Sequence, residues 1–275
     1  MSKDFITTKL DDGFKKEYFY KNGNVSQIFY SNKEKELHKD DGPAIIMYYE
    51  DGKISEECYY KNNKYCDGLS FIRYYQNGKR RTIRYYQNGK KHRIGKPAEI
   101  WYHENGNVSY INYYKNDKRH RLDGPARNFY SKNGNIQKEV YYKYGSIHRE
   151  DGPAEIEYFS NGLVKRESYY FENKNHKVDG PARIEYYKNG SIMEEYYYEN
   201  GLFHRDSGPA VQFYYDNGNT DVVYYYKHDK CHRENGPAFV KYSRSGDVMI
   251  EEYYIDGKKF DEFQYYVKIA TKDKS

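Results

Sequence analysis

The sequence is poor in the residues that build a compact core or a crosslinked fold. Its mean hydropathy is −1.19, and its 275 residues include only seven prolines and three cysteines. A compact globule of this length would need a thick aliphatic core to offset the chain entropy that is lost on folding. The composition therefore argues against an ordinary compact domain.

Two further absences indicate the cellular compartment of the protein. No apolar run approaches the roughly 18 residues that span a membrane, and the opening residues MSKDFITTKL lack the apolar core of a secretion signal. Cys58, Cys66 and Cys231 show no pairing pattern. An odd number of cysteines at irregular spacing indicates a reducing compartment, so we expect a soluble cytoplasmic protein.

The chain also lacks a block of one charge. Its 46 basic and 41 acidic residues are interleaved, with a formal net charge of +5. No run of like charge is long enough for a nucleic-acid-binding arm. Aromatic residues instead make up 19% of the chain, and tyrosine alone supplies 38 residues. Because disordered chains are poor in aromatic residues, we expect a thin, elongated structure that is stabilised by tyrosines.

All seven prolines occur in one recurring motif, His-Arg-x-Asp-Gly-Pro-Ala, or in a close variant of it. From Pro97 to Pro237 they recur every 28 residues. Glycine permits a bend, and proline cannot donate a ladder hydrogen bond, so it needs a bulge or an edge-like position. We interpret the motif as a structural joint, and two of its clear copies comprise His120, Arg121, Asp123, Gly124, Pro125, His148, Arg149, Asp151, Gly152 and Pro153.

Each 28-residue unit contains two strand-like runs and two turn signals. The runs are rich in Tyr and β-branched residues, which favour strands, and Asn-Gly pairs such as Asn133-Gly134 suit turns that need a positive φ. No window shows helical periodicity. We predict an all-β fold, an elongated single antiparallel meander of tandem two-stranded repeats. Two strands add roughly 10 Å per repeat, and so long a ribbon must twist or form a trough.

The repeat spacing predicts a single array over residues 1–275. Residues 10–33 are interpreted as a degenerate N-terminal capping repeat, residues 34–257 as eight repeats, and residues 258–275 as a C-terminal capping strand and tail. Degenerate terminal units are typical of capped repeat arrays. The outer strands expected at residues 14–20 and 260–270 invite self-association, because edge strands pair readily with other chains.

Aligning the repeats produces three complete tyrosine columns. They begin at Tyr48, Tyr59 and Tyr60 and recur in every later repeat. Cross-strand aromatic pairing explains columns that occur in every unit. Stacking of nucleic-acid bases on an aromatic platform is the alternative.

The run Tyr-Tyr-x-Asn-Gly-Lys-x-His-Arg-x-Asp-Gly-Pro-Ala is carried by YYQNGKKHR from Tyr85 and by YYKNDKRHR from Tyr113. It resembles the MORN repeat, and still more the MORN-variant repeats of bacterial proteins labelled antitoxin-like. The 28-residue unit also resembles repeats in uncharacterised proteins of large DNA viruses of amoebae. The resemblance extends from about Leu10 to Gly257. It implies a β-repeat ribbon that acts in scaffolding, dimerisation or lipid contact, and a viral source would place it in the host cytoplasm or the virion.

The motif concentrates His, Arg and Asp, so a metal site and a catalytic site both need weighing. Successive motif histidines should lie about 10 Å apart, whereas zinc–nitrogen bonds are about 2 Å long. One His and one Asp from a single repeat are a poor donor set. A catalytic site needs a nucleophile at a unique place, which repetition does not supply. We therefore predict a non-enzymatic protein with no catalytic residue, metal or cofactor.

Residues that break the repeat are better candidates for a specific contact. A basic patch in the second repeat and an aromatic cluster in the third form the candidate binding surface, which comprises Phe71, Arg73, Arg80, Arg81, Arg84, Trp101, His103 and Tyr110. Simple tolerance of variation at an exposed face is the competing explanation. We predict a scaffold for an unknown protein partner. The alternatives are a peripheral binder of anionic lipid or nucleic acid, and an antitoxin-like neutralising partner by analogy.

Overall fold

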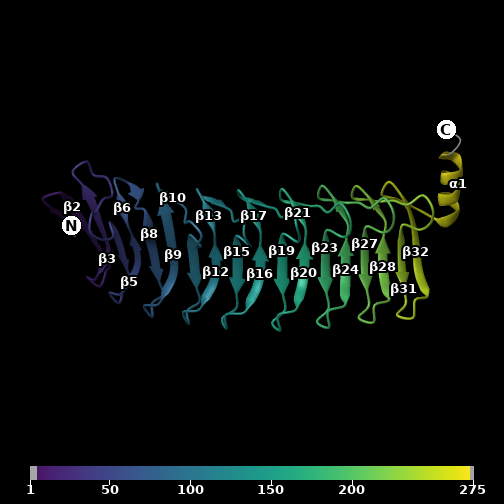
Figure 1. Ribbon diagram of the computed structural model, residues 1–275, viewed down its shortest axis with the longest axis horizontal. Helices are drawn as coiled ribbons and strands as arrows, with labels where there is room; N and C mark the ends of the chain where they lie inside the picture. The colour runs from purple at the N-terminus through teal and green to yellow at the C-terminus, as the bar shows by residue number, and fades with distance from the viewer. Residues whose placement is uncertain (1–4, 273–275) are drawn as a thin grey trace. The chain divides into compact units, whose positions relative to one another are not determined.

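The computed structural model describes residues 5–272. Residue contacts divide the chain into two compact units. The first unit runs to Ile136 and also takes in Tyr142–Gly145, and the second comprises Gln137–Tyr141 and the residues from Ser146 onward. Within each unit the long strands lie side by side in chain order (Figure 1). The predicted all-β antiparallel meander of tandem repeats is confirmed.

The first unit is built on an antiparallel meander in which each long strand pairs with the next. Its long strands are β1 (Phe5–Lys9), β2 (Gly13–Phe19), β3 (Val25–Asn32), β4 (Ile45–Tyr48), β5 (Ile54–Cys58), β8 (Gly68–Tyr74), β9 (Arg80–Gln87), β11 (Glu99–Tyr102), β12 (Val108–Asn112) and β15 (Arg127–Tyr130).

The second unit repeats this arrangement. Its long strands are β16 (Ile136–Val140), whose first residue belongs to the first unit, β19 (Glu155–Tyr158), β20 (Val164–Ser168), β23 (Arg183–Tyr186), β24 (Ile192–Tyr196), β27 (Val211–Tyr214), β28 (Thr220–Tyr224), β31 (Phe239–Tyr242) and β32 (Val248–Ile255), and the short β33 (Lys258–Phe260) pairs with the end of β32.

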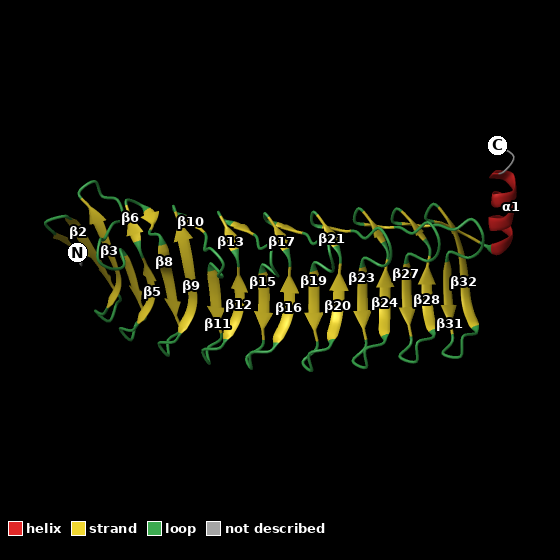
Figure 2. Cartoon of the chain, in the orientation of Figure 1, coloured by secondary structure: helices red, strands yellow, loops and turns green. Residues whose placement is uncertain are grey.

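Most repeats also contain a pair of very short strands that the sequence patterns did not separate from the second long strand, and in one repeat a single short strand, Lys90–Lys91, pairs with the end of β9 instead. These strands are β6 (Tyr60–Lys61), β7 (Lys64–Tyr65), β10 (Lys90–Lys91), β13 (Tyr114–Lys115), β14 (Lys118–Arg119), β17 (Tyr142–Lys143), β18 (Ser146–Ile147), β21 (Tyr170–Phe171), β22 (Lys174–Asn175), β25 (Tyr198–Glu199), β26 (Leu202–Phe203), β29 (Tyr226–Lys227) and β30 (Lys230–Cys231). In Figure 2 these short hairpins lie beyond one end of the long strands.

The two turns of a repeat have different backbone geometry. In the short hairpins both central residues have positive φ, as at Asn200 (52°) and Gly201 (90°), which is the pattern of a type I′ turn. In the long hairpins the glycine alone has positive φ, as at Gly190 (88°), and the strand register shifts between Glu185 and Tyr186. This pattern of a glycine beside a bulge matches the common longer hairpin loop.

The chain ends in a helix, so the prediction of a closing strand over residues 260–270 is wrong. Helix α1 spans Glu262–Lys272 (Figure 2). Asp261 caps it, because its Oδ1 accepts the backbone N–H of Gln264 at 2.8 Å. Tyr265 and Ile269, four residues apart, pack in a hydrophobic cluster against the strands. The aromatic and β-branched residues here suggested a strand, but the cap and the four-residue spacing favour a helix.

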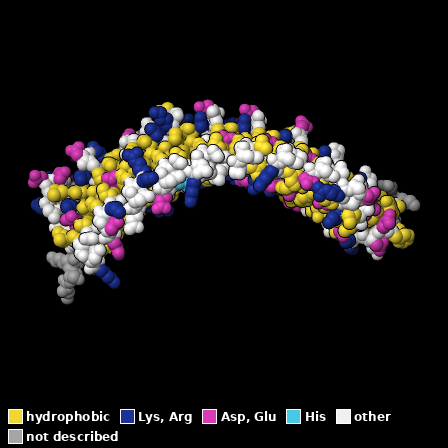
Figure 3. Space-filling view, turned by 90° about the horizontal axis from the view of Figure 1, so that it is seen from below, with side chains coloured by type: hydrophobic (Ala, Val, Ile, Leu, Met, Phe, Trp, Pro, Cys, Tyr) yellow, Lys and Arg dark blue, Asp and Glu magenta, His cyan; other side chains and the backbone are white. Residues whose placement is uncertain are grey.

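The other end of the meander also differs from the prediction. The strand at residues 14–20 is not at the edge, because β1 pairs with β2 from Phe5↔Tyr18 to Lys9↔Phe14. The edge strand is therefore β1, and all of its residues are exposed. Figure 3 shows basic and acidic side chains interspersed on the visible face, as the interleaved sequence charge indicates.

Candidate interaction surface

The second tyrosine column anchors each joint. The N–H of Tyr169 donates to the carbonyl oxygen of Ala182 at 2.7 Å, and the N–H of His176 donates to the carbonyl oxygen of Tyr169 at 3.2 Å. Tyr169 lies between β20 and β21, so these bonds hold the chain where it leaves the long strand. Ala182 is fully buried, as are the alanines of the other motif copies. The motif therefore connects one repeat to the next at a close-packed point.

The motif arginine lies over the same tyrosine. In the copy at His148, the Arg149 guanidinium is 4.0 Å from the ring centroid of Tyr141, and its Nη1 donates to the carbonyl oxygen of Pro153 at 3.3 Å. Its Nε also contacts Asp151 Oδ1 at 2.8 Å. The same stacking occurs at Arg93, Arg121, Lys177, Arg205 and Arg233. The motif cations are thus held against the protein.

The motif histidine reaches the short hairpin turn of the following repeat. Nδ1 of His120, His176 and His232 accepts a backbone N–H located 24 residues further along the chain, at 3.1 to 3.4 Å. Burial lowers the pKa of His120, with help from the charges of Lys115 and Lys143. A neutral imidazole suits an acceptor role. Contacts between repeats therefore account for these three motif histidines.

Most of the predicted binding surface is brought together on one sheet face, where its charges are already paired. Phe71 is buried, and the guanidiniums of Arg73 and Arg84 lie 5.5 and 4.4 Å from its ring. Arg73 pairs with Glu56 at 2.6 Å and Arg84 with Glu99 at 2.8 Å. Trp101 stacks on Tyr110 at 5.2 Å. Burial raises the pKa of Tyr110 to about 12.

The other three residues of the predicted surface lie beside the turns of the long hairpins. Arg80 and Arg81 are exposed, and Arg81 lies 5.6 Å from the ring of Tyr75. His103 Nε2 hydrogen-bonds the carbonyl oxygen of Tyr130 at 3.0 Å. Several other repeats have tyrosine at that position, and its hydroxyl makes the equivalent bond, for example Tyr75 to Tyr102 at 2.7 Å. His103 thus has a structural role that its departure from the repeat did not reveal.

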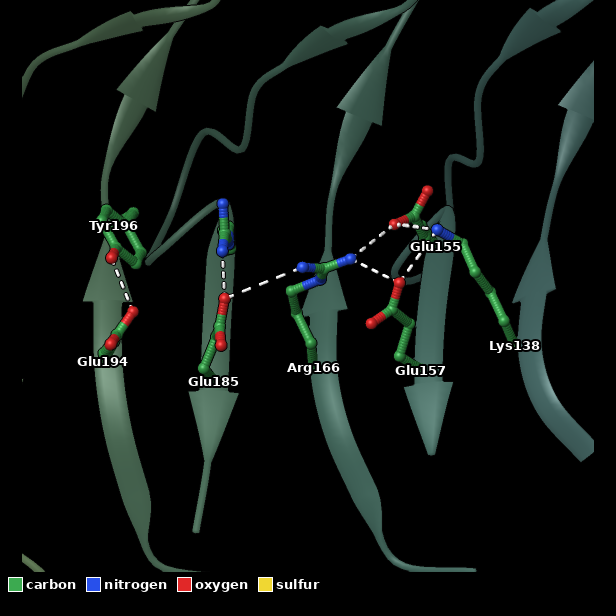
Figure 4. Close-up of polar contacts among 8 residues, drawn as sticks. Lys138, Glu155, Glu157, Arg166, Glu185, Glu194 and Tyr196 are labelled. Atoms are coloured by element: carbon green, nitrogen blue, oxygen red, sulfur yellow. Dashed lines mark hydrogen bonds and ion pairs between the residues drawn. The ribbon is translucent and has the colours of Figure 1, made fainter. Parts of the chain in front are cut away.

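In the second unit, equivalent strand positions carry a row of paired charges. Lys138 contacts Glu155 at 2.7 Å and Glu157 at 3.0 Å, and Arg166 contacts both of those carboxylates (Figure 4). Burial by itself would lower the pKa of Lys138, but the hydrogen bonds and charges of the two glutamates raise it. Arg166 also lies 3.8 Å from Glu185. These partly buried charges neutralise one another and leave little attraction for an outside ion.

A groove between two successive joints of the first unit has a different character. Its cavity volume is about 500 Å³, and its lining includes Ile94 and Leu122, which occupy the variable position of the motif. These two side chains are 82% and 85% exposed. Four other copies carry an acidic residue at that position: Asp40, Glu150, Asp206 and Glu234. Ile94 and Leu122 are not among the residues predicted from sequence, although an apolar residue between a cationic residue and a turn was a usable signal.

The fold and this surface define a class of protein, the tandem β-repeat proteins in which a short unit is stacked along a meander. Four segments match the family described as the MORN repeat variant, at residues 45–62, 98–116, 126–144 and 182–200. The chain is a MORN-like tandem repeat protein. Repeats of this family are not catalytic and generally mediate contact with proteins or membranes.

Other comparisons add little. No curated protein has a significantly similar sequence. Among solved structures, the chain is similar to "TcdB2-TccC3-TEV" with 11% identity and to "TcdB2-TccC3-Cdc42" with 12% identity, and each match has a TM-score of 0.15. Each alignment covers 89% of this chain and only 18% of the other. Among residues 5–272, no helix has the length and apolar character needed to cross a membrane.

Proposed function

We propose that the chain is a non-enzymatic scaffold that binds a protein partner, and that the groove at Ile94 and Leu122 is a principal contact. The array is proposed to comprise a degenerate capping repeat over residues 10–33, eight repeats over 34–257 and a C-terminal cap from residue 258 onward. The observation that supports the proposal is the pair of apolar side chains, each more than four-fifths exposed, lining one groove. Exposed apolar side chains that share a groove are typical of an interaction site.

The charges around the groove indicate the chemistry of the partner. Arg93 and Arg121 line it but are stacked on Tyr85 and Tyr113, and Arg121 also pairs with Asp123. A strongly bound polyanion would need free cations. With Lys115 also in the lining, the groove is apolar with a weakly basic rim. We infer that its occupant is an apolar protein segment flanked by acidic residues.

The test compares capture of proteins from the native cell by the intact chain, by I94E/L122E and by V178E. Val178 holds the equivalent motif position in the second unit and is 84% exposed, so it is a matched control. We expect a partner that binds the intact chain and V178E but not I94E/L122E. A synthetic peptide from that partner, apolar with acidic flanks, should reproduce the binding. If I94E/L122E captures the same partner as the intact chain, the groove is not the contact site.

Salt dependence separates this proposal from binding of anionic lipid or nucleic acid. Affinity that rests on phosphate contacts should fall steeply between about 50 and 200 mM salt, whereas capture through the apolar groove should change little. The exposed Arg80 and Arg81 provide the matched variant for the phosphate alternative, because R80E/R81E should abolish that binding and leave groove binding intact. Turnover of any substrate by the purified chain would overturn the non-enzymatic proposal.

A further inference from the structure

Two residues that depart from the repeat meet at one motif histidine in the second unit. His228 stands at the turn position that holds Asn62, Asn116 and Asn200 in other repeats. Glu199 stands where several repeats have lysine, as at Lys227. Both lie beside His204, although Glu199 and His228 are 29 residues apart in the sequence. Their convergence is a specific feature of this repeat.

The side chains present a compact set of ligand atoms. Glu199 Oε2 lies 3.1 Å from His228 Nε2 and 3.6 Å from His204 Nε2. One ligand atom from each of the three residues lies within 4.8 Å of the others. Asp206 Oδ1 adds a second carboxylate oxygen, 3.2 Å from His204 Nε2. Two imidazole nitrogens and two carboxylates are a favourable donor set for Zn²⁺.

Stacking on a motif histidine has a structural precedent in the chain, but an acidic residue at the position of Glu199 does not. The rings of His204 and His228 are parallel, with centroids 4.1 Å apart, and His120 stacks on Tyr144 with the same spacing. Tyr144 holds the turn position of His228, and Lys115 holds the position of Glu199. Ring stacking on the motif histidine is therefore a feature of the repeat. The departures at His228 and Glu199 add a second nitrogen ligand and a carboxylate.

We propose that Glu199, His204 and His228, with Asp206 as a fourth ligand, bind one Zn²⁺ ion. Zinc bonds of about 2.0 to 2.2 Å place tetrahedral ligands roughly 3.3 Å apart, close to the separations seen here. A metal binds imidazole in the plane of the ring, so the stack opens by rotation of His228, whose side chain is 52% exposed. Zn²⁺ clamps hairpin β25–β26 to hairpin β29–β30. The sequence-based prediction of no metal was based on the motif histidines alone, and His228 lies outside the motif.

The test is titration of the full chain with Zn²⁺ in a calorimeter, together with thermal unfolding with and without the ion. We expect one ion per chain and a higher unfolding midpoint in Zn²⁺. H228N restores the asparagine of other repeats and should fold normally, because residue 228 has a φ of 48° that asparagine tolerates. It should weaken binding by roughly tenfold or more, and E199K should do the same.

Two controls separate this site from other zinc ligands. H92N changes a motif histidine that faces Asn116, and C66S removes a partly exposed thiol, so both should bind Zn²⁺ like the intact chain. The proposal is overturned if the intact chain shows no binding, or if H228N and E199K bind as tightly as it does. Loss of binding in C66S alone would assign the ion to the cysteine and also overturn it.

Discussion

The hydroxyl of Tyr187 donates a 2.7 Å hydrogen bond to the carbonyl oxygen of Tyr214, one repeat further along the chain. The same bond joins Tyr49 to Tyr74 and Tyr215 to Tyr242. Because each donor and acceptor belong to neighbouring repeats, these bonds connect repeats at the end of the strands away from the motif joints. The motif and the tyrosine bonds therefore tie adjacent repeats at two separated places.

Removing or adding one such hydroxyl should change stability in opposite directions. Y187F should lower the free energy of unfolding by about 1 kcal/mol, the usual net value of a hydrogen bond. Phe159 occupies the equivalent position in another repeat of the same unit, so F159Y should raise it by a similar amount or less. Urea denaturation measures both. Equal destabilisation by both variants would show that ring packing, and not the bond, matters.

The cation over the second tyrosine column should be replaceable by lysine but not by alanine. R149A loses the contact with Tyr141 and the bond to the Pro153 carbonyl, and should cost about 1 kcal/mol. R149K should cost less, because Lys177 already lies 3.9 Å from the ring of Tyr169 in the next copy. Urea midpoints rank the three proteins. A lysine variant as unstable as R149A would contradict a stacking role.

Tyr265 should control the stability of the C-terminal helix and the joint beneath it. Its ring is fully buried, and its hydroxyl accepts the N–H of Gly236 at 3.0 Å and donates to the carbonyl oxygen of Arg233 at 2.9 Å. Y265F leaves both backbone groups without that partner and should cost about 1 to 3 kcal/mol. Hydrogen exchange should become faster in α1 and near Gly236, with residues of the first unit unchanged as the internal control.

The three cysteines should differ in reactivity. Burial raises the pKa of Cys58 to about 12, with a further contribution from Glu56, and raises that of Cys231 to about 11. Iodoacetamide near pH 8.5, close to the ordinary thiol pKa, should therefore modify the partly exposed Cys66 before the buried Cys58 in the folded protein. Peptide mass spectrometry gives the order, and urea should abolish it. Rapid native labelling of Cys58 would contradict its burial.

The same shift has a consequence for stability. Because the folded pKa of Cys58 lies above the unfolded value of about 9, its neutral form is favoured in the fold. The contribution is complete below about pH 9 and is lost as the pH rises toward 12. C58A supplies the control, since its unfolding free energy should depend less on pH across that window.

The strands are longer where the motif is altered, which shows that the joint limits strand length. At Leu69, where proline is replaced, β8 and β9 run for seven and eight residues, and Leu69 pairs with Tyr85. In regular repeats, such as β23 and β24, the strands have four and five residues. Proline cannot donate a ladder hydrogen bond, which explains why the strands stop at the joint.

Several predictions from sequence were accurate because they depend on local chemistry. The 28-residue period, the turn glycines and the tyrosine-rich runs indicated a meander of repeats. The binding surface was harder to predict from sequence, because the exposure of a side chain depends on residues of neighbouring strands. Phe71 breaks the repeat but is buried at 4% exposure, whereas Leu122 occupies a regular motif and is 85% exposed. A departure from the repeat does not by itself say which side of the sheet a residue faces.

The sequence by itself determined the fold class, since the strand and turn propensities of each unit and the proline that ends its strands act over a few residues. Only the tertiary structure decided which residues from different repeats meet. Strand register and the close-packed alanine joints bring Glu199 to His228 and Tyr187 to Tyr214. They also bury Tyr265 of the terminal helix against the last joint. Such contacts depend on the stacking of whole repeats, which no single stretch of sequence encodes.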